Sequence, residues 1–376
     1  MANEPTSGWQ PDWAVAPGEI LLEALQDRGM TQSELARRMA RPPKTINEII
    51  KGKAAITAET AIQLERTLGI SARFWTGLEA TFREHMARHQ AQEQLEANAS
   101  WVDGFPLNDL IRHHLIQRGA TKATTLAELL SFFRLSSPDA FERHWLEPGA
   151  AFRSSPTFMA SPKAVAAWLR WGEIEATEIA DAPPFDALRF RQVLDEIRPM
   201  TRRDPFMQIF NRVKAMCAEA GVIVILTPEL AGTHLSGAAR WVGGRPVIQL
   251  SLRHKSDDHF WFTFFHEAGH ILTSPRRRQF VDTADLASAA DPDVEEETAN
   301  RFARNCLLPP HEYQAFVDGG DFSESAVRAF AQAQRIAPGI VVGRLQRDNK
   351  VPRSHLNSLK RRIHWPADNG PRATRA

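Results

Sequence analysis

Apolar and polar positions recur with a helical period over most of the chain, and with the short period of β-strands in one stretch only. That stretch follows a helical pattern over residues 205–220. It begins with the apolar run 222–226, a predicted strand, and continues with the segments 235–241 and 247–252 on either side of a Gly-Gly dipeptide. Two strand patterns joined by such a dipeptide predict a β-hairpin. We therefore expect a mainly α fold with one small β-sheet, in the α+β class.

Near the N-terminus, three short helical patterns follow one another with abrupt breaks, over residues 18–27, 32–39 and 43–50. The second pattern starts after Thr31, a favoured N-cap residue, and Glu34 stands three residues later, as in a capping box. Two short helices separated by a turn of three or four residues are typical of the supersecondary unit that places a recognition helix in the major groove of DNA.

Basic residues gather in this segment and are opposed by Glu48 alone within the third helix and its flanks: Arg37, Arg38, Arg41, Lys44, Lys51 and Lys53. Such cations can pair with phosphates, and we expect Arg41 and Lys51 to do so. Lys44, Thr45 and Asn47 lie on the exposed face of the third predicted helix, where base edges would be reached. Gln32, at the start of the second helix, is a candidate phosphate contact. The alternative is a small helical bundle with a solvated basic face.

The residues of this segment also carry a family resemblance. The segment 17–90 resembles the helix-turn-helix of the xenobiotic-response-element (XRE) regulators, and specifically the HigA antitoxin branch, through the runs Gly29–Ala36, Thr45–Lys53 and Ile56–Trp75. Two positions of the turn differ from the family pattern, since Ala40 replaces the usual glycine and Pro42 a small polar residue. The resemblance implies binding to double-stranded DNA, as an operator or promoter, by a homodimer.

A second motif, His266-Glu267-x-x-His270, lies in an otherwise apolar predicted helix over residues 258–272. Residues i and i+4 share one helix face, so both imidazoles can bind one Zn²⁺ while Glu267 acts as the general base on a water molecule. Two histidines and a carboxylate in an apolar helix would be costly to bury without partners, and a metal ion supplies them. The alternative is a helix with two hydrogen-bonded core histidines.

A catalytic zinc ion needs a third protein ligand. A third histidine in the pattern His-Glu-x-x-His-x-x-Gly-x-x-His is excluded, because Thr273 and Arg276 occupy the two later positions. A glutamate of the acidic run 295–297, at the start of the next predicted helix, is the other option, although acidic residues at a helix N-terminus also have the plain electrostatic explanation. We expect one or two of these carboxylates to face the metal.

The chain from about residue 210 to 345 resembles the ImmA/IrrE metallo-endopeptidases, through the runs Ser236–Ala238, Pro246–Leu250, Phe262–Leu272, Glu296–Ala303 and Leu307–Pro309. The match to their Glu-x-x-Ala-Asn-x-Phe-Ala pattern implies that Glu296 is the third ligand, with Glu297 as the second choice. It also places Asn300 one turn later, where it would orient a histidine. His234, His259 and Tyr313 are candidates for stabilising the oxyanion, each with a structural role as the alternative.

Composition limits the remaining possibilities. The chain has 376 residues and a net charge of +1, so it is neither a histone-like polycation nor an acidic disordered chain. Two cysteines cannot form a disulfide framework, which fits a reducing cytoplasm. We expect no signal peptide and no membrane span, because no apolar run approaches roughly 20 residues. The predicted parts are a flexible tail (1–16), a helix-turn-helix domain (17–95), a helical connector or sensor region (96–200), a zincin-like metallopeptidase domain (201–318), a C-terminal helical part (319–363) and a basic tail (364–376), with the chain from residue 353 onward loosely held.

Together these patterns predict a cytoplasmic DNA-binding transcriptional regulator that carries a zinc-dependent endopeptidase domain. The resemblance implies that it cleaves itself or a partner repressor in a response to stress or to mobile elements. The alternative is a non-enzymatic HigA-like antitoxin or repressor, in which the zinc fold serves as a sensor or as a platform for a partner such as a toxin.

Overall fold

The computed structural model describes residues 15–146, 161–179, 183–273 and 292–365. The chain divides into two compact units, residues 1–99 and residues 100–376. It is mainly helical with one small sheet, which confirms the predicted α+β class. Among the described helices, none combines the length and the apolar character that crossing a bilayer requires. Most of the two predicted tails, 1–16 and 364–376, lies outside the described residues.

The first unit is an all-α bundle around one core. Its helices are α1 (Pro17–Gln26), α2 (Gln32–Arg38), α3 (Pro43–Ile50), α4 (Ala58–Leu68) and α5 (Ala72–Ala97). Leu21, Leu35, Ile46 and Trp75 are fully buried in its centre, so the three predicted amphipathic helices pack on one another as their apolar faces indicated.

The capping box predicted at the start of α2 is only half formed. The Thr31 side chain accepts a hydrogen bond from the backbone N–H of Glu34 at 3.1 Å, as an N-cap should. The carboxylate of Glu34 does not return to Thr31, because it is paired with Arg38 one turn along the helix. The prediction of Thr31 as the N-cap is therefore confirmed. The predicted return hydrogen bond from the Thr31 backbone N–H to the Glu34 side chain is wrong.

The turn between α2 and α3 adopts a left-handed conformation at Ala40, whose φ is 52°. Its backbone closes through hydrogen bonds from Ala40 N to Arg37 O at 3.2 Å and from Arg41 N to Ala36 O at 2.9 Å. Left-handed backbone costs a residue with a Cβ roughly 1–2 kcal/mol, which glycine would not pay. The turn characteristic of the motif thus forms with alanine in place of glycine.

The second unit holds a three-stranded sheet and the helices around it. The strands are β1 (Ile223–Leu226), β2 (Gly237–Val242) and β3 (Arg245–Leu250). The helices are α6 (Leu107–Arg112), α7 (Lys122–Phe133), α8 (Pro138–Phe141), α9 (Pro162–Glu178), α10 (Ala187–Ile197), α11 (Phe206–Glu219), α12 (Asp257–Thr273), α13 (Pro292–Leu307), α14 (Pro310–Asp318), α15 (Glu324–Ala333) and α16 (Pro338–Arg347). The predicted hairpin is present, with Gly243 and Gly244 at φ of 57° and 81° in its two-residue turn.

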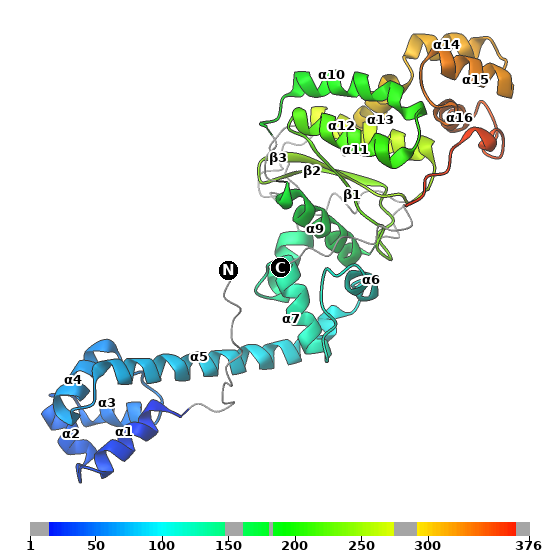
Figure 1. The fold of residues 1–376 in the computed structure, drawn as a ribbon. Helices are drawn as coiled ribbons and strands as arrows, with labels where there is room; N and C mark the ends of the chain where they lie inside the picture. The colour runs from blue at the N-terminus through cyan, green and yellow to red at the C-terminus, as the bar shows by residue number, and fades with distance from the viewer. Residues whose placement is uncertain (1–14, 147–160, 180–182, 274–291, 366–376) are drawn as a thin grey trace. The chain divides into compact units, whose positions relative to one another are not determined.

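The sheet has the order β1-β3-β2, with β1 parallel and β2 antiparallel to the central β3. Figure 1 shows α9 on one side of the sheet and α11 and α12 on the other. Side chains therefore alternate between two cores: Ile223 and Ile225 meet Ala176 of α9, whereas Val224 and Ile248 face the core shared with α11 and α12. Burial on both faces explains why β1 is a continuous apolar run.

The five helices α6 to α10 of the predicted connector, residues 96–200, all belong to the second unit, and α9 and α10 pack on the sheet and its core. Helix α9 is buried along most of its length, and the indole N–H of Trp168 donates to the carbonyl of Pro228 at 3.1 Å. Helix α10 contributes Phe190 to the core that contains α12. The C-terminal half of the region therefore packs against the sheet and the core that contains α12.

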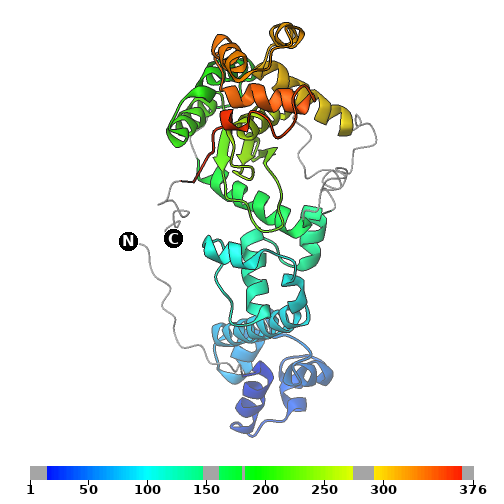
Figure 2. The same ribbon diagram turned by 90° about the vertical axis from the view of Figure 1, so that its right-hand side faces the viewer.

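The basic stretch from residue 353 is docked as far as the structure describes it, so the prediction of a loosely held chain there is wrong. Arg361 pairs with the buried carboxylate of Asp257 at 2.9 Å, and Lys360 pairs with the buried Asp258 at 2.7 Å. Both carboxylates lie in the first turn of α12. Figure 2 shows this segment, in red, within the second unit. The C-terminal cations thus fix the start of the helix that carries the histidines.

Candidate metal centre and nucleic-acid interface

The histidine motif lies in α12, which is buried on most sides. Trp261, Phe264 and Phe265 are fully buried among the surrounding helices and strands, because the helix packs between the sheet, α13 and α16. The remaining face carries the two histidines, four residues apart and therefore one turn apart on the same side. Their side chains are part-buried, at 14% exposure for His266 and 20% for His270. The apolar side chains of α12 thus fix the helix in the core, and His266 and His270 lie on its one polar face.

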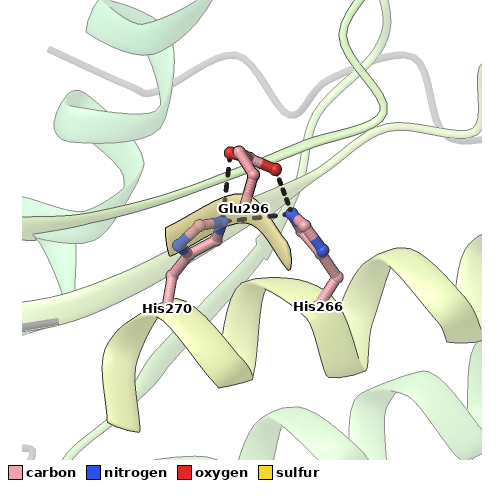
Figure 3. A group of neighbouring side chains, drawn as sticks. All are labelled: His266, His270 and Glu296. Atoms are coloured by element: carbon pink, nitrogen blue, oxygen red, sulfur yellow. Dashed lines mark hydrogen bonds and ion pairs between the residues drawn. The ribbon is translucent and has the colours of Figure 1, made fainter. Parts of the chain in front are cut away.

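His266, His270 and Glu296 converge on one point (Figure 3). The two Nε2 atoms are 3.1 Å apart, and the Glu296 carboxylate oxygens lie 3.3 Å from His266 Nε2 and 3.4 Å from His270 Nε2. Atoms bound tetrahedrally to Zn²⁺ at about 2.0–2.2 Å stand roughly 3.3–3.5 Å from one another. Oε2 of Glu296 faces His266 and Oε1 faces His270, and each separation is close to such a distance between ligand atoms. Two imidazoles with one carboxylate form a ligand set of catalytic zinc sites. These residues fit a bound metal ion.

The neighbouring carboxylate, Glu297, has a different partner. Its side chain is paired with Arg304, two turns later on the same helix. Glu296 alone of the acidic run joins the histidine cluster within the described residues. The sequence signal for this pair is the spacing of seven residues between Glu297 and Arg304, which puts both side chains on one helix face two turns apart.

Glu267 is almost fully buried, at 7% exposure, beside the edge strand β2. A Cβ built on Gly237 would lie 2.8 Å from Glu267 Oε1 and 2.6 Å from Thr263 Cγ2, so glycine leaves the room that this carboxylate occupies. Burial raises the pKa of Glu267, while the nearby His266 and His270 and a backbone hydrogen bond from Ala239 act in the opposite direction. A carboxylate with a raised pKa in a nearly dry position has the properties of a general base.

Electrostatics link the three clustered side chains. The hydrogen bonds from His266 and His270 hold the pKa of Glu296 well below its ordinary range. Burial lowers the pKa of His270, but its hydrogen bond to Glu296 and the charges of Glu267 and Glu296 outweigh burial and raise it. Glu296 is thus an anionic ligand at neutral pH, as a divalent cation requires.

The residue predicted to orient a histidine does not act on His266. Asn300 is half-buried one turn after Glu296, but His266 Nδ1 is buried with no hydrogen-bond partner among the described residues. Of the two positions that excluded a third histidine, Thr273 closes α12 with a hydrogen bond to Gly269 O at 2.7 Å, and Arg276 lies outside the described residues.

The three oxyanion candidates have other contacts. The Tyr313 hydroxyl donates to Asp348 at 2.9 Å, which gives it a structural role. The ring of His259 stacks on that of His254 with centroids 4.3 Å apart. His234 lies 3.8 Å from Glu229.

In the first unit, α3 presents its polar side to solvent. Asn47 and Lys51 are exposed, and the side chain of Lys44 is 84% exposed, with its ammonium 3.8 Å from Glu48. Thr45 is half-buried on the same helix, while Ile46 and Ile49 hold the opposite side in the core. An exposed polar face on a helix anchored by an apolar one is the arrangement of a recognition helix. Gln32 is half-buried at the first position of α2.

Arg41 is engaged within its own unit. Its guanidinium donates to Gln63 Oε1 at 2.6 Å and lies 3.1 Å from the Glu59 carboxylate, both on α4. A phosphate contact by Arg41 would compete with these bonds. The sequence pattern could not indicate this, because the partners lie about twenty residues downstream.

Comparisons with known proteins divide along the same lines as the structure. The helix-turn-helix family model matches residues 21–75, and the model of the IrrE N-terminal-like domain, a peptidase family, matches residues 217–335. Over its N-terminal part the chain is 36% identical to virulence-associated protein I of Dichelobacter nodosus across 80 residues, which is 21% of this chain and 74% of that protein. It is 38% identical to the uncharacterized HTH-type transcriptional regulator YddM of Escherichia coli K12 across 79 residues, 21% of this chain and 73% of that one.

Among solved structures, an addiction module antidote protein of the HigA family from Coxiella burnetii is 32% identical. The similarity covers 22% of this chain and 91% of that chain, with a TM-score of 0.21.

Proposed function

The chain belongs to the helix-turn-helix transcriptional regulators and carries an IrrE-like peptidase-family domain, and from this premise we propose that it is a DNA-binding regulator with a zinc-dependent endopeptidase activity. Its substrate is a protein, either the chain itself or a partner repressor, in a response to stress or to mobile elements. The observation that supports the enzymatic part is the convergence of His266, His270 and Glu296, with the buried Glu267 on the same helix as the histidines.

The proposed chemistry is peptide hydrolysis. His266, His270 and Glu296 would hold the zinc ion, whose Lewis acidity acidifies a water molecule and polarises the scissile carbonyl. Glu267 accepts a proton from the attacking water at its carboxylate and delivers it to the departing amine. Burial serves this role, because the raised pKa of Glu267 brings it nearer to the pH at which it must both take up and release a proton.

Gly237 and Ala239 keep Glu267 in position from β2. The missing Cβ of Gly237 leaves space for the carboxylate, and the backbone of Ala239 donates a hydrogen bond to it. These contacts orient the base without neutralising it.

The proposed DNA site is the exposed face of α3. In this proposal Lys44, Thr45 and Asn47 would contact base edges, Lys51 and Gln32 would contact phosphates, and a homodimer would bind two half-sites. Arg41 would join them only by releasing Gln63 and Glu59.

The decisive test is cleavage by the zinc-loaded full chain of candidate repressors and of itself, followed by electrophoresis. Glu267→Gln keeps the side-chain volume and should abolish cleavage, while Glu312→Gln, an exposed carboxylate on α14, should leave it unchanged. Undiminished cleavage by Glu267→Gln would refute the assigned base. A chain that binds zinc and its operator but cleaves nothing would instead support the non-enzymatic antitoxin or repressor.

A further inference from the structure

A cavity of about 490 Å³ opens in the second unit beside the metal cluster. Helix α12 forms one wall with Phe262, α13 another with Arg304 and Leu307, and α16 a third with Ile340 and Arg347. The ring of Phe262 stacks on that of His266, with centroids 6.2 Å apart, so the cavity lies next to the histidines along α12. Its volume falls in the range of small-molecule sites, about 300–1,000 Å³.

The charges of the cavity wall are strongly one-sided. Asp258 is the one carboxylate among the lining residues. Five cations line the cavity: Arg304, Arg344, Arg347, Arg353 and Lys360. Three of these cations have carboxylate partners in the fold, since Lys360 pairs with Asp258, Arg344 with Asp348 and Arg304 with Glu297. Arg347 and Arg353 form no ion pair within the part of the chain that the structure describes.

Arg347 lies at the mouth of the cavity, where its side chain is exposed on one side and packed against Phe262 on the other. The guanidinium of Arg347 lies over the ring of Phe262, 5.0 Å from the ring centroid, in a cation–π contact at the cavity wall. Burial lowers its pKa, and the neighbouring charges of Arg304 and Arg344 lower it further, against the opposing effect of Glu297 and Asp348. An anion bound at this position would relieve the repulsion between the cations.

The apolar part of the lining comes from Phe262, Leu307, Leu308 and Ile340, and the uncharged polar part from His259, Gln346 and Asn357. We propose that this cavity binds a small amphipathic anion, with a carboxylate or phosphate group held by Arg347 and Arg353 and an apolar body against Phe262, Leu307 and Ile340. Guanidinium groups suit such anions because their N–H groups can donate pairs of hydrogen bonds. The site is distinct from the metal cluster and does not depend on peptidase activity.

Calorimetric titration of the full chain with phenyl phosphate tests this proposal, since that probe combines a phosphate with an aromatic body. We expect one saturable site in the millimolar range or tighter, weaker binding of inorganic phosphate and of phenol alone, and a loss of affinity with rising salt. Arg347→Gln should weaken binding about tenfold, as expected for a lost charge-assisted hydrogen bond. Arg353→Gln is a second variant with the same expectation.

Two controls separate this cavity from other anion sites. Arg328→Gln removes a cation of α15 whose partner is Glu324, outside the cavity, and should leave the affinity unchanged. Treatment of the full chain with a chelator should also leave it unchanged, because the anion is not held by the metal. Failure to saturate, loss of binding after chelation, or unaltered binding in both Arg347→Gln and Arg353→Gln would each overturn the proposal.

Discussion

Replacing Gly237 by alanine should damage catalysis while leaving the metal ligands in place. The new Cβ would lie 2.6 Å from Thr263 Cγ2, 2.8 Å from Glu267 Oε1 and 2.9 Å from Glu267 Cγ. Ordinary contacts between such atoms are about 3.5–4.0 Å, so the side chain of Glu267 or the strand must move by roughly 1 Å. Glu267 is nearly fully buried and has little free space to move into.

A displacement of about 1 Å in a catalytic group can cost on the order of 100-fold in rate. We therefore expect kcat/KM for a peptide substrate to fall about 100-fold in Gly237→Ala. Overpacking should also lower the free energy of unfolding by roughly 1–3 kcal/mol. Zinc content should not change, because none of the three close contacts involves His266, His270 or Glu296.

The assay is cleavage of a fluorogenic peptide, with zinc content and urea unfolding measured on the same preparation. Gly77→Ala is the matched control, because a Cβ on Gly77 meets nothing within 4 Å. Wild-type kcat/KM in Gly237→Ala would refute the close packing of Glu267 against β2. Loss of zinc together with activity would show that the substitution acts through the metal cluster instead.

Three further predictions concern other parts of the chain. Lys44→Ala should weaken binding to the chain's own promoter about tenfold in a shift assay, because it removes one base or phosphate contact of roughly 1–2 kcal/mol. Lys350→Ala is the control and should leave binding unchanged. Equal binding by both variants would exclude Lys44 as a contact. Thr31→Ala should lower the free energy of unfolding by about 1 kcal/mol in urea, because it removes the N-cap of α2, and an unchanged midpoint would argue against that cap. Burial raises the pKa of Glu175 to about 7 from 4.5, so the folded state keeps a proton that the unfolded state has lost, and stability falls as pH rises between these values. Glu175→Gln should therefore stabilise the chain at pH 8 by about 1–3 kcal/mol and have little effect at pH 4; equal effects at both pH values would contradict this.

Local signals predicted much of the fold. Thr31 and the pair Gly243-Gly244 act through local backbone contacts and conformation. Thr31 begins a helix and the glycine pair closes a hairpin in the structure, as the sequence predicted. The apolar helix around the histidines was equally clear, since its periodicity reflects burial between a sheet and two helices.

Contacts between distant segments could not be predicted in the same way. Three such contacts are the hydrogen bond of Arg41 to Gln63 on α4, the pairing of β3 with both other strands, and the ion pair of Arg361 with Asp257. Each joins residues that are far apart in sequence, and the periodicity of apolar positions carries no information on such pairs. The acidic run illustrates the limit most clearly. Sequence spacing allowed Glu296 or Glu297 to face the histidines. The structure separates them, because Glu296 lies beside His266 and His270 whereas Glu297 is paired with Arg304.

The measurement that bears most directly on the central claim is the zinc content of the purified full chain and of ligand variants. We predict about one zinc per chain for the wild type, for Glu267→Gln and for Glu297→Gln. His266→Ala, His270→Ala and Glu296→Ala should each lose it, with affinity reduced by orders of magnitude. A folded wild-type chain that binds no zinc, or a full complement of zinc in Glu296→Ala with its loss in Glu297→Gln, would contradict the account.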